Sequence, residues 1–140
     1  MNRFLILSVF VAGILLLSAC DKDDETSDRF SLLTGAAWQS DSLLINGVDA
    51  SGPGEMLENF RGTAHFREDY TGTFGNYEGT WSFAQNETEL VIRSDSLPIP
   101  MLSTKIQELT QESLKVTTSF PDLQNPTGPA LQIRLTFKAE

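Results

Sequence analysis

Cys20 is the residue whose type and position predict a covalent reaction. It is the only cysteine among the 140 residues, and it directly follows an apolar run that ends in Leu17-Ser18-Ala19. Such a sequence forms a lipobox, where a bacterial signal peptide is cut and the new N-terminal cysteine is acylated. A single cysteine leaves no disulfide or cysteine-based metal cluster as a competing role. We therefore expect Cys20 to carry diacylglycerol on its sulfur and an amide-linked acyl chain such as palmitate.

The segment before Cys20 has the three-part layout of a signal peptide. Asn2 and Arg3 make a short positive start, and residues 4–17 are almost wholly apolar. This apolar stretch is shorter than the roughly 20 residues that a membrane-spanning helix needs. We expect residues 1–19 to be removed, and an uncleaved membrane anchor is the alternative.

Residues 20–30 are predicted to form a lipidated acidic tether. The run Asp21-Lys22-Asp23-Asp24-Glu25 and the polar residues after it, up to Asp28, should be disordered. The run resembles the export tag of surface lipoproteins in a Gram-negative phylum known for glycan foraging. We therefore expect an outer-membrane lipoprotein exposed at the cell surface. The periplasmic face of the outer membrane is one alternative. Retention in the inner membrane is another, because Asp21 directly after the cysteine resembles an inner-membrane retention signal of enteric bacteria.

The remaining polar residues do not assemble a reaction centre by spacing. His65 is the single histidine, and we expect it to be solvated on the outer side of a strand. Asp41, Asp69 and Asp95 are scattered without the spacing of a calcium loop. We therefore expect no catalytic residue, no metal, no cofactor and no enzyme activity.

Removing residues 1–19 removes one cation and no acid, so the net charge changes from −9 to −10. This acidic balance disfavours nucleic acid as a partner.

Two serines match the Asp-Ser/Thr-apolar pattern that resembles an O-glycosylation site in the same phylum. Ser42 lies in Asp41-Ser42-Leu43, and Ser96 lies in Asp95-Ser96-Leu97. We expect Ser96 to be the better acceptor, because a proline-containing loop is predicted around it.

Apolar and polar residues alternate with a period of two from Trp38 onward, which is the strand signal. Glu55 and the five residues after it are expected to form one helical turn, with Met56, Leu57 and Phe60 turned inward. The strands are expected at residues 37–45, 61–67, 71–74, 77–83, 89–93, 101–109, 114–120 and 131–138.

Eight short strands with one-sided burial predict an all-β domain over residues 31–140, built as an antiparallel up-and-down barrel. The expected connections differ at the two ends. At one end three of four are long, namely residues 46–60, 94–100 and 121–130, whereas the connections at the other end are all short. A barrel with one tight end and one end dressed with loops is typical of a ligand-binding barrel.

Several short motifs, in this order, resemble the lipocalin-like domains of small bacterial lipoproteins. They are Leu33-Thr34-Gly35-Ala36-Ala37-Trp38, Ile45-Asn46-Gly47-Val48, Glu78-Gly79-Thr80-Trp81-Ser82-Phe83 and Ile106-Gln107-Glu108-Leu109-Thr110. Lipocalins carry Gly-x-Trp at the first strand, whereas here Ala36 stands in the glycine place. In that family an arginine of the last strand packs over the tryptophan. Arg134 is the matching residue, although the alternation of its strand directs it outward.

The resemblance implies a barrel fold and a ligand-binding role, and it transfers no catalytic residue. Two functions from different classes remain open. The first is binding of a small apolar or amphipathic ligand at the loop-bearing end. The second is a surface interaction or structural lipoprotein with a packed barrel and unknown protein partners. The aromatic residues expected to line a pocket, or to fill the core, are Trp38, Phe66, Tyr77, Trp81, Phe83, Phe120 and Phe137.

Replacement of Cys20 by Ala is expected to abolish both acylation and membrane retention, because no other thiol can accept the lipid. Cell fractionation and intact-mass measurement of wild-type and variant protein test this. Unchanged mass and unchanged membrane retention would contradict it.

Overall fold

The computed structural model of the chain describes residues 27–140. The expected signal peptide, Cys20 and most of the expected tether therefore lie outside the described residues. Within the described part there is one α-helix, α1 (Asp28–Thr34), and a short 3-10 helix, η2 (Glu58–Phe60). The strands are β1 (Ala37–Ile45), β2 (Val48–Asp49), β3 (Thr63–Phe66), β4 (Thr71–Phe74), β5 (Tyr77–Ala84), β6 (Glu89–Arg93), β7 (Met101–Leu109), β8 (Ser113–Phe120) and β9 (Leu131–Ala139).

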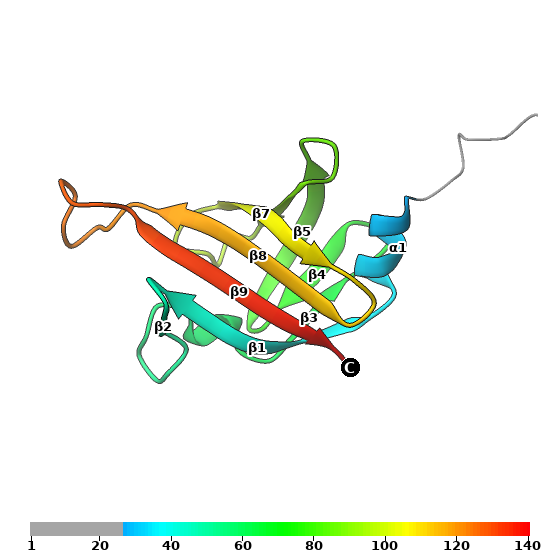
Figure 1. Ribbon diagram of the computed structural model, residues 1–140, viewed down its shortest axis with the longest axis horizontal. Helices are drawn as coiled ribbons and strands as arrows, with labels where there is room; N and C mark the ends of the chain where they lie inside the picture. The colour runs from blue at the N-terminus through cyan, green and yellow to red at the C-terminus, as the bar shows by residue number, and fades with distance from the viewer. Residues whose placement is uncertain (1–26) are drawn as a thin grey trace, which may run out of the picture.

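Eight of these strands close into an antiparallel up-and-down barrel (Figure 1). Each strand from β3 to β9 pairs with the next along the chain, and β1 pairs with both β3 and β9. The ring therefore has no open edge, which removes the unpaired backbone groups of an edge strand. The remaining strand, β2, pairs only with β1 and forms a small hairpin beside the barrel. Asn46 and Gly47 turn this hairpin with φ of 50° and 81°, as expected for an Asn-Gly turn.

The sequence pattern predicted the strands well, because period-two alternation defines which face is buried. The expected barrel is confirmed, and β1, β4, β6 and β7 have the expected bounds. The strand expected at 61–67 is shorter as β3. Gly62 has a φ of 109°, which breaks the strand before Thr63, and the N–H of Arg67 donates to the carbonyl of Thr71 in the following turn.

The inward-facing residues form one core that runs through the barrel. Trp38 is fully buried, and its Nε1 donates to the carbonyl oxygen of Leu33 at 2.9 Å. Arg134 is exposed on β9, so the tryptophan is held by the backbone at the end of α1 and not covered by that arginine. The strand facing expected for β5 is also confirmed, because Tyr77 and Trp81 are both buried.

Helix α1 covers the end of the barrel that carries the short connections. Ser27 caps the helix by accepting a hydrogen bond from the N–H of Phe30 at 3.1 Å. The Ser27 hydroxyl also donates to the carboxylate of Glu87, and Arg29 Nη1 donates to the Glu87 carbonyl at 3.0 Å. Glu87 ends a run of three residues, from Gln85, with positive φ in the β5–β6 turn. The expectation that Ser27 and Asp28 belong to a disordered run is therefore wrong, because a cap and a helix dock them on the barrel.

The described helices are short, and none of them has the length and apolar character needed to cross a membrane.

Trp81 is the centre of an aromatic cluster beneath α1. Its ring lies 5.7 Å from that of Phe30, 5.0 Å from Tyr70 and 5.8 Å from Phe66, measured between ring centroids. Its Nε1 donates to the carbonyl of Arg67 at 3.0 Å, so the indole is both packed and hydrogen-bonded. The side chain is only 2% exposed.

Replacement of Trp81 by Ala should therefore lower the free energy of unfolding by roughly 3–5 kcal/mol, because it leaves a large cavity and removes the helix contact. Chemical denaturation followed by circular dichroism measures this. Met101→Ala is a matched control on the exposed outer face of β7, with an expected change within about 0.5 kcal/mol. Equal effects of the two substitutions would contradict the assignment of Trp81 to the core.

Candidate functional site

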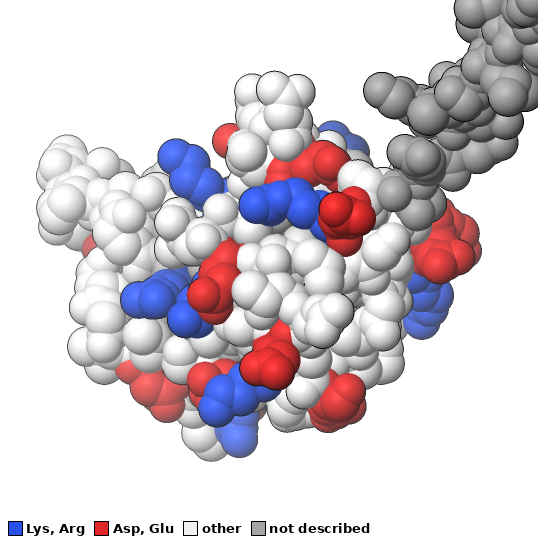
Figure 2. Space-filling view, turned by 45° about the vertical axis from the view of Figure 1, so that its right-hand side comes forward, with Lys and Arg blue, Asp and Glu red and all other residues white. Residues whose placement is uncertain are grey.

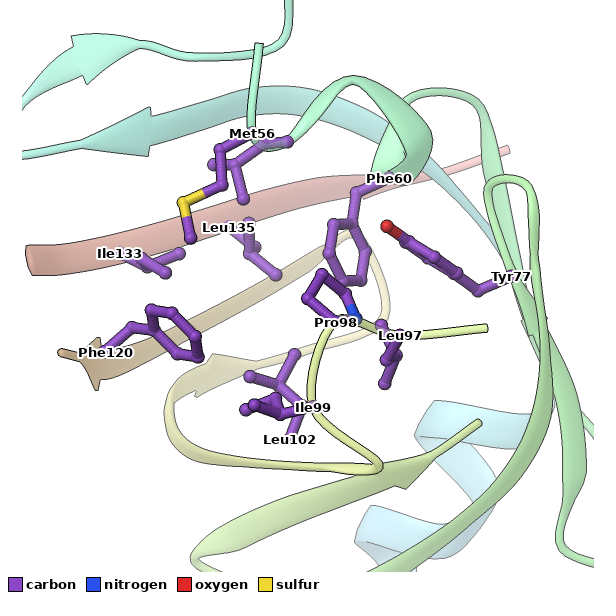
Figure 3. Close-up of a pocket in the computed structure, with 11 residues that line it drawn as sticks. Met56, Phe60, Tyr77, Leu97, Pro98, Ile99, Leu102, Phe120, Ile133 and Leu135 are labelled. Carbon is purple, nitrogen blue, oxygen red and sulfur yellow. The ribbon is translucent and has the colours of Figure 1, made fainter. Parts of the chain in front are cut away.

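The candidate site is an apolar slot at the loop-bearing end of the barrel, opposite α1 (Figure 3). Its cavity volume is about 40 Å³. Three groups of residues converge on it, from the segment around η2, from the β6–β7 loop and from the strand ends of the barrel. The lining residues are Met56, Leu57, Phe60, Tyr77, Leu97, Pro98, Ile99, Leu102, Phe120, Ile133 and Leu135.

The segment around η2 forms one wall because backbone hydrogen bonds fold it inward. The N–H of Leu57 donates to the carbonyl of Ala50 at 2.9 Å, and that of Phe60 donates to Leu57 at 3.0 Å. The Phe60 ring then packs on Tyr77 at the start of β5, with 4.8 Å between ring centroids. This confirms the expected inward direction of Leu57 and Phe60. Met56 was expected to turn inward as well, but it is 41% exposed and forms the outer lip of the slot.

The β6–β7 loop forms the opposite wall. Ser94 is buried, and its hydroxyl donates to the carbonyl of Glu78 at 2.7 Å. The N–H of Ser94 donates to the carbonyl of Pro100 at 3.2 Å, and that of Leu97 donates to Ser94 at 3.3 Å. These bonds close the loop on itself and direct Leu97 into the interior. The segment was expected only as a proline-containing loop, so this wall was missed. Leu97 and Ile99 beside two prolines were only a weak signal, because apolar loop residues occur both buried and exposed.

The interior of the barrel beneath the slot is filled by side chains. The remaining void there has a volume of about 10 Å³, room for at most one water molecule. Pockets that bind small molecules usually enclose about 300–1,000 Å³. The barrel is therefore a packed core, and its accessible apolar surface lies at the mouth.

The seven aromatic residues expected to line a pocket or fill the core separate into three groups. Tyr77 and Phe120 line the slot. Phe66 and Phe137 line the small interior void. Trp38, Trp81 and half-buried Phe83 line neither; Trp38 is bonded to the end of α1, and Trp81 contacts Phe83 with 5.4 Å between ring centroids.

Gly79 does not leave room for a ligand or a ring beside Trp81. A Cβ built on Gly79 would lie 1.9 Å from the carbonyl oxygen of Arg93 and 3.1 Å from the Cα of Ser94. The glycine is therefore needed for the close approach of β5 to the end of β6.

The titratable groups with a resolved shift lie on the surface and support turns. A hydrogen bond from the Ser51 side chain lowers the pKa of Asp49, and one from Thr71 lowers the pKa of Asp69. Ser113 and then Lys115 lower the pKa of Glu108. His65 is exposed on β3, as expected. Over residues 27–140, no group of three or more potential ligand side chains could hold a metal ion.

The surface charges are mixed in sign on the face shown in Figure 2. Acidic and basic side chains are interspersed there, with apolar and neutral surface between them. This face offers no continuous basic track of the kind that follows a nucleic-acid backbone.

The two candidate glycosylation sites lie in different surroundings. Ser96 is exposed in the β6–β7 loop, next to the slot residue Leu97. Ser42 lies within β1, where it is half-buried and paired with Thr136 of β9. The greater accessibility of Ser96 keeps it the better candidate acceptor.

The chain matches no protein-family model and no curated protein.

Replacement of Gly79 by Ala should lower the free energy of unfolding by roughly 1–3 kcal/mol, because backbone atoms have to move apart to admit the methyl group. Thermal or chemical denaturation measures this. Gly52→Ala is the control, since there the nearest obstacle to a Cβ is the flexible end of the Glu55 side chain, at 2.6 Å. A tolerated Gly79→Ala substitution would contradict the close approach of β5 to the end of β6 at this position.

Proposed function

We propose that this protein is a bacterial lipoprotein, anchored by Cys20 in the outer membrane and exposed at the cell surface, that binds a protein partner through its loop-bearing end. The packed barrel acts as the rigid support of this surface and carries no large internal pocket. The lipobox and the acidic run after it support the anchoring. The closed up-and-down barrel supports kinship with lipocalin-like lipoprotein domains.

The filled interior is the observation that carries this proposal. The cavities of about 40 and 10 Å³ are far below the volume of a typical small-molecule pocket. A barrel that stores a lipid or a metabolite needs internal space, whereas one that supports a binding surface does not.

Exposed apolar side chains gather on the loops at the slot end. Val48 in β2 is 69% exposed, Met56 41% and Leu123 in the β8–β9 loop 74%. Met56 lines the slot, whereas Val48 and Leu123 lie on other loops of the same end. Single exposed apolar residues are common, but several at one end of a domain are typical of an interaction surface.

A small apolar or amphipathic ligand in the slot is the second candidate. The observation in its favour is that the lining side chains are apolar except for the hydroxyl group of Tyr77. Two of the walls are loop segments, so a movement of residues 94–100 would enlarge the space without opening the barrel. Copurification of such a ligand distinguishes this function from the first.

The proposed surface is tested by a photo-crosslinking amino acid placed at Met56 or Leu123 in living cells. We expect crosslinked protein adducts at both positions, because their exposed side chains face a partner. Lys105, exposed on the outer face of β7, is the control position and should give none. Native mass spectrometry of the purified wild-type protein should show the acylated chain without a bound small molecule.

Adducts at Lys105 equal to those at Met56 would contradict the loop-end surface. A stoichiometric small molecule that is lost when Ile99 is replaced by Trp would favour the second candidate instead.

A further inference from the structure

Four carboxylates lie close along the chain to residues that line the slot, and we call them the acidic rim: Glu55, Glu58, Asp95 and Asp122. Each lies within two residues along the chain of a residue that lines the slot. Glu78, Arg61 and Arg134 meet the same measure, so five carboxylates stand against two cations near the slot, and Glu58 and Arg61 also line one surface hollow together. The mouth therefore combines an apolar centre with a negatively charged border.

The acidic rim is not neutralised by ion pairs within the domain. Over residues 27–140, the ion pairs are those of Lys115 with Glu108 and of Lys138 with Asp41, both away from the slot. The rim side chains of Glu55, Glu58 and Asp95 are exposed, and that of Asp122 is half-buried. Their charge thus remains available to a partner.

The size of the slot limits what can enter it. A cavity of about 40 Å³ accepts the end of one apolar side chain, and the exposed Met56 at its lip adds a further apolar contact. A long acyl chain would need the interior of the barrel, which is filled.

We propose that the loop-bearing end binds a lysine- or arginine-rich polypeptide segment of a partner protein, with one apolar side chain of that segment seated in the slot. The proposal rests on the proposed function and specifies the chemistry of the partner. In this arrangement the cationic residues that flank the apolar side chain form ion pairs with the acidic rim. These ion pairs raise the rate of association and select the partner by charge.

Charge disfavours lipid as the occupant. Anionic headgroups and fatty-acid carboxylates would be repelled by the acidic rim. The chain also enters the described domain at Ser27, at the α1 end and not at the slot end.

The test uses the mature acylated protein in zwitterionic nanodiscs and two labelled peptides. One is acetyl-Lys-Lys-Leu-Phe-Leu-Lys-Lys-amide, and its twin has Glu at each Lys position. Fluorescence anisotropy measures binding at low and high salt, with empty nanodiscs as the blank. We expect the cationic peptide to bind at least about tenfold more tightly than its twin at low salt, and the difference to shrink as salt screens the rim.

Two pairs of variants locate the binding. Glu55→Lys/Asp95→Lys should weaken the cationic peptide about tenfold, whereas the matched pair Glu68→Lys/Glu112→Lys, at the opposite end, should not. Met56→Asn should weaken binding of both peptides several-fold, whereas Met101→Asn on the outer face of β7 should not. All these positions are exposed, so circular dichroism should show unchanged folding.

Equal binding of the two peptides, or equal effects within either variant pair, would overturn the proposal. Co-sedimentation of the protein with anionic vesicles, lost in Met56→Asn, would assign the slot to lipid instead. If Met56 gives crosslinks in cells but the two peptides bind equally, the proposed cationic chemistry of the partner is wrong and the interaction surface stands. The lack of crosslinks at Met56 and Leu123 would overturn the interaction surface itself.

Discussion

The pairing of β1 with β9 is the interaction on which the rest of the structure depends. It joins the first and last strands of the barrel and runs from Trp38 opposite Ala139 to Ile45 opposite Ile133. A shift in register between Ser40 and Ser42 leaves Asp41 as an extra residue, and such a bulge bends a strand in the way that closure of a small barrel requires. Without this pairing two edges would be open, and the core residues of both strands would lose the neighbours that bury them.

Closure of so small a barrel has a consequence for where binding can occur. Eight strands leave an interior that side chains can just fill, and here Phe66, Phe74 and Phe137 help to fill it. The apolar core is then accessible only where the strands end and the loops begin. The two ends have become different: α1 and the Trp81 cluster close one, whereas the loops at the other end leave the slot partly open. The packed barrel and the Trp81 cluster thereby supply stability, whereas the loops around the slot supply the accessible surface.

The barrel could be predicted from the sequence because alternation is a local signal that directly reports burial. The Asn46-Gly47 turn and the facing of Trp81 follow from the same kind of local information. The slot could not be predicted, because Leu97 and Ile99 point inward only through hydrogen bonds that Ser94 makes with distant backbone. Helix α1 was missed for a related reason: seven residues carry a weak helical signal, and docking of Phe30 on Tyr70 and Trp81 stabilises it.

The cap of α1 by Ser27 and the bonds of Ser27 and Arg29 to Glu87 determine how a force on the preceding chain would reach the barrel. If the chain is anchored at Cys20 as proposed, a pull on the anchor would reach the described domain at Ser27 and act first on α1, since the helix precedes every strand. The helix is held by a few hydrogen bonds and by Phe30, whereas β1 is held along its length by two neighbouring strands. Under tension the helix would therefore peel away first and lengthen the link by several residues, while the barrel and its mouth stay intact. In the anchored protein that we propose, the bonds to Glu87 would therefore break before the strand pairing of the barrel does.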